Sequence, residues 1–309
     1  MSTDARQSGS QPKLSIVVVA YDMARELPRT LQSLTPSYQR DIVSETYEVI
    51  LVDNGSPTHL GEDLVSSIGS NFRYHYIQDA KPSPAAAANT GVALSGGAIV
   101  CIMIDGARLV TPGLIHYGLL AFRMFDDPIV EVMGWHLGPE KQQVSVSKGY
   151  NQEVEDQLLD QIQWPQDGYR LYEIASPSIS SSRGWFAHAT ETNAIFMRRE
   201  TYNELGGYDT AFDGPGGELV NLDFYCRACE RENSPLVRLI GEGTFHQFHG
   251  GVSSNLPRKK SDRLFQKWAA HYKKIRGYPY VHPTKDPVFL GTIPPQALRH
   301  IAAAPQASG

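Results

Sequence analysis

The sequence predicts an α/β fold with a mostly parallel central sheet that helices cover on both faces. Short apolar runs rich in β-branched residues alternate with segments in which apolar residues recur every three or four positions. The first of these runs are continuously apolar, which is typical of strands buried on both faces. Strands that alternate with helices of this length form parallel sheets.

The first half of the chain shows this alternation most clearly. The run LSIVVVA predicts the first strand, and the spacing of Leu27, Leu31 and Leu34 predicts the helix after it. Two of the following strands end in an acid, Asp53 and Asp105. In the first half we expect further strands at 47–53, 72–78 and 98–105, with helices at 58–69 and 83–97 between them.

Beyond Pro112 the pattern is looser. A glycine-rich loop opens a helix within 212–233, and a strand runs into two histidines within 236–251. The tail at 258–283 is basic and aromatic, and Pro-rich segments follow it. The other expected elements are helices at 112–125 and 153–162, a strand at 128–138, and a short strand and helix within 191–209.

The bulk properties exclude several classes of protein. A length of 309 residues fits one large domain or two ordinary ones. The net charge of −5 provides no basic field for nucleic acid. The longest apolar runs are too short to span a bilayer, and residues 1–12 lack an apolar signal core. Three cysteines are expected to be reduced structural thiols, so we expect a cytoplasmic protein: Cys101, Cys226 and Cys229.

Two common nucleotide-binding signatures are missing. No G-x-G-x-x-G follows the first strand, and no G-x-x-x-x-G-K-[ST] occurs. The acids at the strand ends, Asp53 and Asp105, therefore remain the leading candidates for a ligand site, because ligands gather at the carboxyl ends of open α/β sheets. The alternative is that each acid only caps a turn.

Four segments carry a resemblance to a known family. They are LSIVVVAYDMARELPRTLQSL, YEVILVDNGSP, AAAANTGVALSGGAIVCIMIDGA and NAIFMRRETYNELGGYDTAF. In this order they resemble family 2 glycosyltransferases with the GT-A fold, over about residues 13–250. The resemblance implies a nucleotide-binding half at 13–110 and an acceptor half at 111–255 within one domain, 13–255. We expect a disordered tail at 1–12 and a helical or irregular extension at 256–309.

The resemblance also implies a donor site. By motif match, Ala20, Tyr21 and Asp53 hold the nucleobase of a nucleotide-sugar. Asp105 matches the first acid of a D-x-D element, which meets a divalent cation, Mn²⁺ or Mg²⁺, on the diphosphate. The second acid is replaced by Ala107, so the cation site is deficient as it stands.

His246 and His249 are candidates to complete this metal site. They lie three residues apart after a strand, so both imidazoles can face one point. Neutral imidazole suits Mn²⁺ or Zn²⁺ better than Mg²⁺, and some GT-A enzymes recruit a C-terminal histidine to the metal. Two alternatives stay open: the histidines bond each other or the acceptor, or basic residues balance the phosphate charge in place of a metal. The basic candidates are Arg258, Lys259 and Lys260.

An inverting transfer needs a carboxylate that takes the proton of the acceptor hydroxyl. The family keeps acids at the start of a helix after a glycine loop, and here these are Glu218 and Asp223, with Asp213 a weaker candidate. Either acid can instead simply compensate the dipole of the helix N-terminus.

The acceptor side is less defined. Trp185 and Arg183 can contact a sugar acceptor, although Trp185 fits a core position equally well. The C-terminal stretch with Trp268, Tyr272, Lys273, Lys274 and Arg276 fits an anionic membrane, a lipid-phosphate acceptor, or a solvated helix face with aromatic residues packed beneath it.

Together these observations predict a glycosyltransferase of polysaccharide biosynthesis. It would move a sugar from a nucleotide-diphosphate sugar to a hydroxyl of a glycan or lipid-linked acceptor, with inversion expected and oligomeric state open. One alternative is a non-catalytic nucleotide- or sugar-binding module, since Ala107 and Leu219 stand where acids are expected. A nucleotidyltransferase is disfavoured, because AYDMARELPR contains no glycine.

Overall fold

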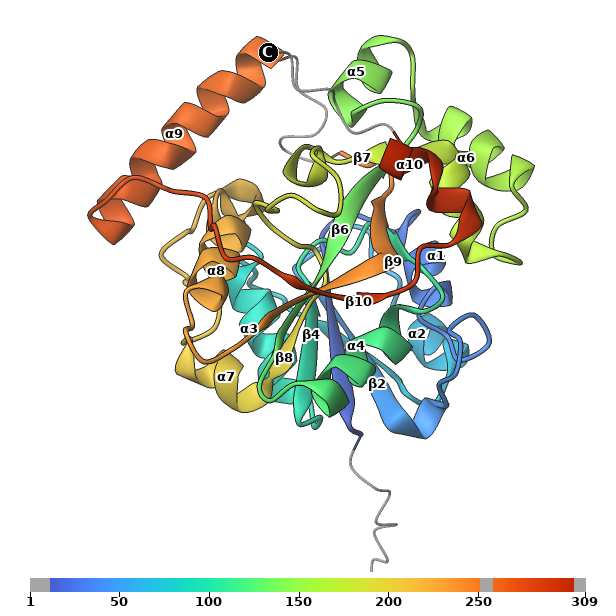
Figure 1. The fold of residues 1–309 in the computed structure, drawn as a ribbon, viewed down its shortest axis with the longest axis horizontal. Helices are drawn as coiled ribbons and strands as arrows, with labels where there is room; N and C mark the ends of the chain where they lie inside the picture. Colours follow the sequence, from blue (N-terminus) through green and yellow to red (C-terminus); the bar gives the residue numbers. More distant parts are fainter. Residues whose placement is uncertain (1–11, 251–257, 303–309) are drawn as a thin grey trace, which may run out of the picture.

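The computed structural model describes residues 12–250 and 258–302. Within them, Figure 1 shows one twisted central sheet of ten strands. Eight strands follow the order β10-β9-β6-β8-β4-β1-β2-β3, while β5 pairs with β9 and β7 with β6. Their bounds are β1 Leu14–Ala20, β2 Tyr47–Asp53, β3 Phe72–Tyr76, β4 Ile99–Met103, β5 Arg108–Val110, β6 Ile129–Leu137, β7 Ala175–Pro177, β8 Ile195–Arg198, β9 Leu236–His246 and β10 Val288–Gly291.

The main path of the sheet is mostly parallel, as predicted. Strand β1 lies between β2 and β4 and is parallel to both, and β2 is parallel to β3. Strand β9 is parallel to β6 and β10. Strand β8 is the exception, since it runs antiparallel to both neighbours, β4 and β6. All residues of β1 and β2 are buried, which explains their continuous apolar runs.

Helices cover both faces of this sheet (Figure 1). On one face, alternate β1 residues such as Ile16 and Val18 pack with apolar residues of α1, α2 and α4. On the other, Val17 and Val19 pack with α3, α7, α8 and α9. The helices are α1 Leu27–Gln32, α2 Glu62–Ile68, α3 Ala85–Leu94, α4 Leu114–Met124, α5 Gln142–Ser147, α6 Gln152–Gln161, α7 Arg199–Glu204, α8 Val220–Cys229, α9 Arg258–Arg276 and α10 Arg299–Ala302. Among these described helices, none combines the length and apolar character that crossing a membrane requires.

Four short elements were not expected from the sequence: β5, β7, β10 and α5. Each has six residues or fewer, too few to establish a period. Strand β10 lies in the predicted C-terminal extension, yet it pairs with β9 from Val288↔Val237 to Gly291↔Ile240. Part of that extension therefore belongs to the central sheet. The expected tail at 1–12, except for its last residue, and the boundary at 255–256 fall outside the described residues.

Helix α3 approaches β1 closely, and Gly91 makes this approach possible. A Cβ atom at Gly91 would lie 2.3 Å from Val17 Cγ1 and 3.0 Å from Val52 Cγ2. We therefore expect Gly91→Ala to destabilise the protein by about 1–3 kcal/mol through overpacking, a loss that exceeds the gain in helix propensity of up to about 1 kcal/mol. Urea denaturation measures the difference. Gly250→Ala is the control, because a Cβ there meets nothing within 4 Å; an equal or greater stability of Gly91→Ala would contradict the packing argument.

Strand β9 carries a buried carboxyl, Glu242. Its oxygens accept hydrogen bonds from the Tyr169 hydroxyl (2.7 Å) and the Gly113 amide (3.2 Å). Burial nevertheless raises the pKa of Glu242 to about 7. The folded state thus keeps a proton that the unfolded state releases at lower pH. The stability associated with this proton is present in full below the unfolded pKa and is lost as the pH rises through about 7.

Glu242→Gln removes this titration. Relative to the parent protein, we expect the variant to gain about 1–3 kcal/mol in free energy of unfolding between pH 5 and pH 8. Urea midpoints across this range measure the gain. Glu230→Gln, at an exposed position, should show no such trend. A difference between the Glu242 variant and the parent that does not change with pH would mean that Glu242 is ionised in the folded protein at pH 5.

Candidate active site

The two strand-end acids lie on either side of β1. Ala20 pairs with Asp53 of β2, and Val18 pairs with Met103 of β4. Asp53 is the last residue of β2, and Asp105 follows the end of β4 by two residues. The carboxyl edge of the sheet thus brings both predicted donor residues together.

Asp53 is buried and organises the turn after β2. Its carboxylate accepts the Ser56 amide at 2.8 Å and the Tyr74 hydroxyl at 3.0 Å. Burial and the charge of Asp53 raise the pKa of Tyr74, so this hydroxyl stays protonated as a donor. Ala20 is buried as well, whereas the Tyr21 side chain is 56% exposed. The base-binding role of these residues remains a prediction, and Tyr21 offers the accessible surface.

Asp105, His246 and His249 converge on one point, as predicted. The Nε2 atom of His246 lies 3.2 Å from Asp105 Oδ2, and that of His249 lies 3.8 Å from Asp105 Oδ1. The two Nε2 atoms are 3.0 Å apart. All three ligand atoms lie within 4.8 Å of one another. This is a possible metal-binding group, and the antiparallel pairing of β5 with β9 creates it by bringing the histidine strand beside Asp105.

The protonation of His246 suits a metal ligand. Its Nδ1 lies 2.7 Å from the Gln142 side-chain oxygen, and its Nε2 faces Asp105. Burial lowers the pKa of His246 to about 4, so the ring is neutral at physiological pH. Neutral imidazoles beside a carboxylate are a ligand set that divalent transition metals use. The chemistry of this donor set therefore fits a divalent cation.

Arg108 is a residue of this site that the sequence analysis missed. It is buried, and its Nε and Nη2 atoms lie 3.1 and 3.0 Å from Asp105 Oδ2. Burial opposes ionisation of Asp105, but the Arg108 guanidinium and the two imidazoles hold the pKa of Asp105 well below its usual range. The Nη1 atom of Arg108 is buried without a hydrogen-bond partner, so the guanidinium has an unused donor.

The position of Ala107 explains why the second acid is missing. Its side chain is buried in the core shared with α1, α2 and α4, and its carbonyl accepts the Gln247 amide at 2.8 Å. A carboxylate at this position would be placed in apolar surroundings. The charged residue next to Asp105 is Arg108 instead, so this site provides a positive charge where the related pattern provides a second negative one.

The loop that carries His249 is held from the opposite side by α6. The Phe248 amide donates to Glu155 Oε2 at 2.7 Å, and Arg25, which follows β1, contacts Glu155 Oε1 and the Phe248 carbonyl at 3.4 Å. Burial raises the pKa of Glu155 to about 7. Arg25, from the segment after β1, and Glu155 of α6 thus fix the backbone beside the second histidine.

Glu218 precedes α8 in a strained conformation. Its φ of 54° and ψ of −113° are unusual for a residue with a side chain, and such strain concentrates at functional sites. The His271 ring of α9 hydrogen-bonds the carboxylate through Nδ1. The preceding loop lies near the sheet edge: the Gly216 amide donates to the Pro82 carbonyl, and Asn54, next to Asp53, donates to the Lys81 carbonyl.

Asp223, the other candidate base, is buried inside the protein. One oxygen accepts from Arg276 Nε at 2.7 Å, and the other accepts from Arg227 Nε at 2.8 Å and a second Arg276 nitrogen at 2.7 Å. These bonds use the carboxylate fully and hide it from an acceptor hydroxyl. Asp223 is therefore better described as an anchor between α8 and α9 than as a base. Asp213, the weaker candidate, is exposed in the loop that precedes Glu218.

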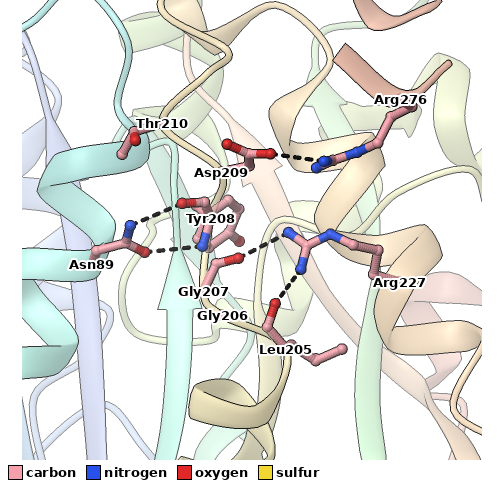
Figure 2. A pocket seen from close by; sticks show the side chains of 9 residues that line it. All are labelled: Asn89, Leu205, Gly206, Gly207, Tyr208, Asp209, Thr210, Arg227 and Arg276. Atoms are coloured by element: carbon pink, nitrogen blue, oxygen red, sulfur yellow. Dashed lines mark hydrogen bonds and ion pairs between the residues drawn. The ribbon is translucent and has the colours of Figure 1, made fainter.

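A pocket of about 350 Å³ lies beside this anchor and not at the strand ends (Figure 2). Asn89 of α3 bonds both the amide and the carbonyl of Tyr208, and Arg227 donates to the Leu205 and Gly207 carbonyls. Arg276 pairs with Asp209 at 2.7 Å. Figure 2 shows these groups bonded to one another around the Gly-Gly turn. The hydrogen bonds and the ion pair that line the pocket thus stabilise this turn and the C-terminal end of α9.

The two residues predicted to contact the acceptor, Trp185 and Arg183, differ in exposure. Trp185 is buried among Trp135 and Tyr172, with ring centroids 5.3 and 5.9 Å away. This corrects the expectation of an acceptor-stacking ring in favour of the core position that the sequence also allowed. Arg183 is exposed, and its acceptor role remains a prediction. Among the basic residues proposed to replace a metal, Lys260 is exposed, whereas the side chains of Arg258 and Lys259 lie outside the described part of the chain.

Comparison with solved structures assigns the fold. The chain resembles S. aureus TarS 1–349 in complex with UDP-GlcNAc, with a TM-score of 0.52, 11% identity, and coverage of 84% of this chain and 66% of that one. It also resembles the mannosyltransferase PcManGT from Pyrobaculum calidifontis in complex with GDP-Man and Mn²⁺, with a TM-score of 0.48, 16% identity, and coverage of 88% and 66%. It spans 43% of a longer TarS chain. The likeness to the UDP-GlcNAc complex of TarS and the curled, mostly parallel sheet show a fold of the GT-A type.

Sequence comparison adds a partial family match. Residues 15–115, the segment from β1 to Asp105 and the start of α4, match the model of Glycosyl transferase family 2. No curated protein matches the chain in a sequence search. The first third of the chain thus resembles a family 2 glycosyltransferase, and it lies on a fold of the GT-A type.

Proposed function

We propose that this enzyme transfers a sugar, with inversion, from a nucleoside-diphosphate sugar to a hydroxyl group of a glycan or lipid-linked acceptor. The observation that carries the proposal is the convergence of Asp105, His246, His249 and Arg108 at the carboxyl edge of the sheet, the edge at which β2 ends in Asp53. An edge that gathers cation ligands and a guanidinium suits a diphosphate.

Different residues of the donor half bind different parts of the nucleotide-sugar. Asp53 and Tyr21 contact the nucleobase, and Arg108, paired with Asp105, places a positive charge beside the diphosphate. Asp105, His246 and His249 would hold a divalent cation, which would neutralise charge on the diphosphate. The histidine ligands favour Mn²⁺ over Mg²⁺. Arg108 stabilises the negative charge that develops on the leaving diphosphate.

The acceptor half uses Glu218 as the general base. The acceptor oxygen forms a bond to the anomeric carbon, the bond from that carbon to the diphosphate breaks, and Glu218 takes the hydroxyl proton. His271 donates to one carboxylate oxygen and fixes the orientation of the other. Single displacement at the anomeric carbon inverts its configuration.

A donor screen tests the proposal. UDP-, GDP-, CDP- and dTDP-sugars are incubated with the protein and a panel of sugar acceptors, with Mn²⁺ or with EDTA, and nucleoside diphosphate release is measured. We expect release with one donor class, dependent on Mn²⁺, and a product of inverted anomeric configuration by NMR. Donor binding without turnover on any acceptor would contradict the proposal in favour of a binding module. A product of retained configuration would overturn the single-displacement mechanism.

A further inference from the structure

Helix α9 concentrates positive charge in an acidic protein. Eight of the chain's 28 lysine and arginine residues lie within Arg258–Arg276, together with one acid, Asp262, although the chain as a whole carries a net charge of −5. The side chains of Lys260, Arg263, Lys267, Lys273 and Lys274 are exposed. The helix therefore carries a local positive field opposite in sign to that of the rest of the molecule.

An apolar stripe runs along the same helix, and the body of the protein uses only part of it. At 3.6 residues per turn, the stripe contains Leu264, Phe265, Trp268, Tyr272 and Ile275. Tyr272 is buried, and Trp268 and Ile275 pack on the same core. Leu264 and Phe265 belong to none of the clusters formed by the described residues, and Phe265 is 43% exposed. The N-terminal half of the stripe is left open.

The helix is anchored at its other end. Arg276 bonds Asp209 and Asp223, and His271 bonds Glu218. In Figure 1, α9 lies along the outer edge of the molecule. On the helix surface, Lys260 and Lys267 lie along one flank of the open part of the stripe. A rigidly held helix thus presents apolar side chains next to cations.

We infer that the N-terminal half of α9 docks on an anionic lipid bilayer. Apolar side chains bordered by lysines are the two components of interfacial helix binding: burial of apolar area among the acyl chains and attraction to anionic headgroups. The acidic remainder of the chain is repelled by the same surface, so the opposing charges orient the molecule with α9 toward the lipid. This inference does not depend on the proposed transfer reaction.

Vesicle sedimentation of the full chain tests the inference. We use vesicles of phosphatidylcholine alone and of phosphatidylcholine mixed with phosphatidylglycerol, at low and high salt. We expect binding to the anionic vesicles only, with release by salt. Phe265→Ser should lower the partition coefficient about tenfold, and Lys267→Glu about fivefold or more. Both positions are exposed, and circular dichroism verifies that each variant is folded.

Two matched controls separate the helix from general surface effects. Phe289→Ser changes a phenylalanine of similar exposure, 41%, on β10, and Lys13→Glu reverses a charge just before β1. Neither should change vesicle binding. The inference is overturned if the parent chain fails to bind anionic vesicles, if it binds neutral vesicles equally well, or if the α9 variants bind like their controls. Stronger binding to duplex DNA or to an acidic polypeptide than to anionic vesicles would also overturn it.

Discussion

Glu218→Gln is expected to lower kcat by about 10²–10⁴-fold while donor affinity stays unchanged. The amide keeps the size of the side chain and its contact with His271, but it cannot accept the proton of the attacking hydroxyl. Because the loss concerns only the transition state, kcat falls and the donor dissociation constant does not. Steady-state transfer assays and calorimetric donor titrations measure the two quantities separately.

Three further variants sharpen this assignment. Glu230→Gln, at the exposed end of α8, should retain activity. Asp223→Asn should lower the free energy of unfolding, because it weakens the bonds that Arg227 and Arg276 make with a buried carboxylate. Asp213→Asn tests the remaining acid of the loop. If Asp213→Asn abolishes transfer and Glu218→Gln does not, the base is Asp213 and the proposed role of Glu218 is wrong.

Asp105→Asn is expected to weaken Mn²⁺ binding by at least about a hundredfold. Asp105 supplies the carboxylate of the Asp–His–His group, and an amide oxygen lacks its charge. The variant also leaves Arg108 without its ion-pair partner. Electron paramagnetic resonance of free Mn²⁺ measures the affinity without donor or acceptor, so the result does not depend on activity.

The pH dependence of Mn²⁺ binding provides an internal test. Since the pKa of His246 lies at about 4, proton competition at this ring becomes important only in acid, and its contribution to Mn²⁺ affinity should be unchanged near neutral pH. Asp63→Asn, on the exposed side of α2, serves as the control and should bind Mn²⁺ like the parent. Full Mn²⁺ affinity in Asp105→Asn would show that the cation is held elsewhere.

The sequence alone determined the layered fold and the edge at which the site lies. Continuous apolar runs such as residues 14–20 can only be satisfied by strands buried on both faces, and parallel strands bring their carboxyl ends to one edge. Asp53 and Asp105 were therefore located by local pattern. His246 and His249 were found because their spacing after a strand is itself local.

Only the tertiary structure showed which side chains surround each candidate residue, and therefore which candidates are accessible to a ligand. Gln142 reaches His246 through packing between segments that are distant in sequence, which no local period encodes. Arg108 is only three residues from Asp105, but its place opposite His246 comes from the pairing of β5 with the distant β9. Asp223 and Trp185 are both buried, which argues against a role as base for Asp223 and against acceptor stacking for Trp185. The sequence could not predict this, because the exposure of a side chain depends on which distant segments pack over it. In the sequence, the apolar stripe of α9 is one continuous helix face. In the structure, the helix is anchored through Arg276, and the apolar clusters of the described residues include only the C-terminal half of this stripe. Local pattern thus determines what an element is, and long-range packing determines which of its side chains remain available.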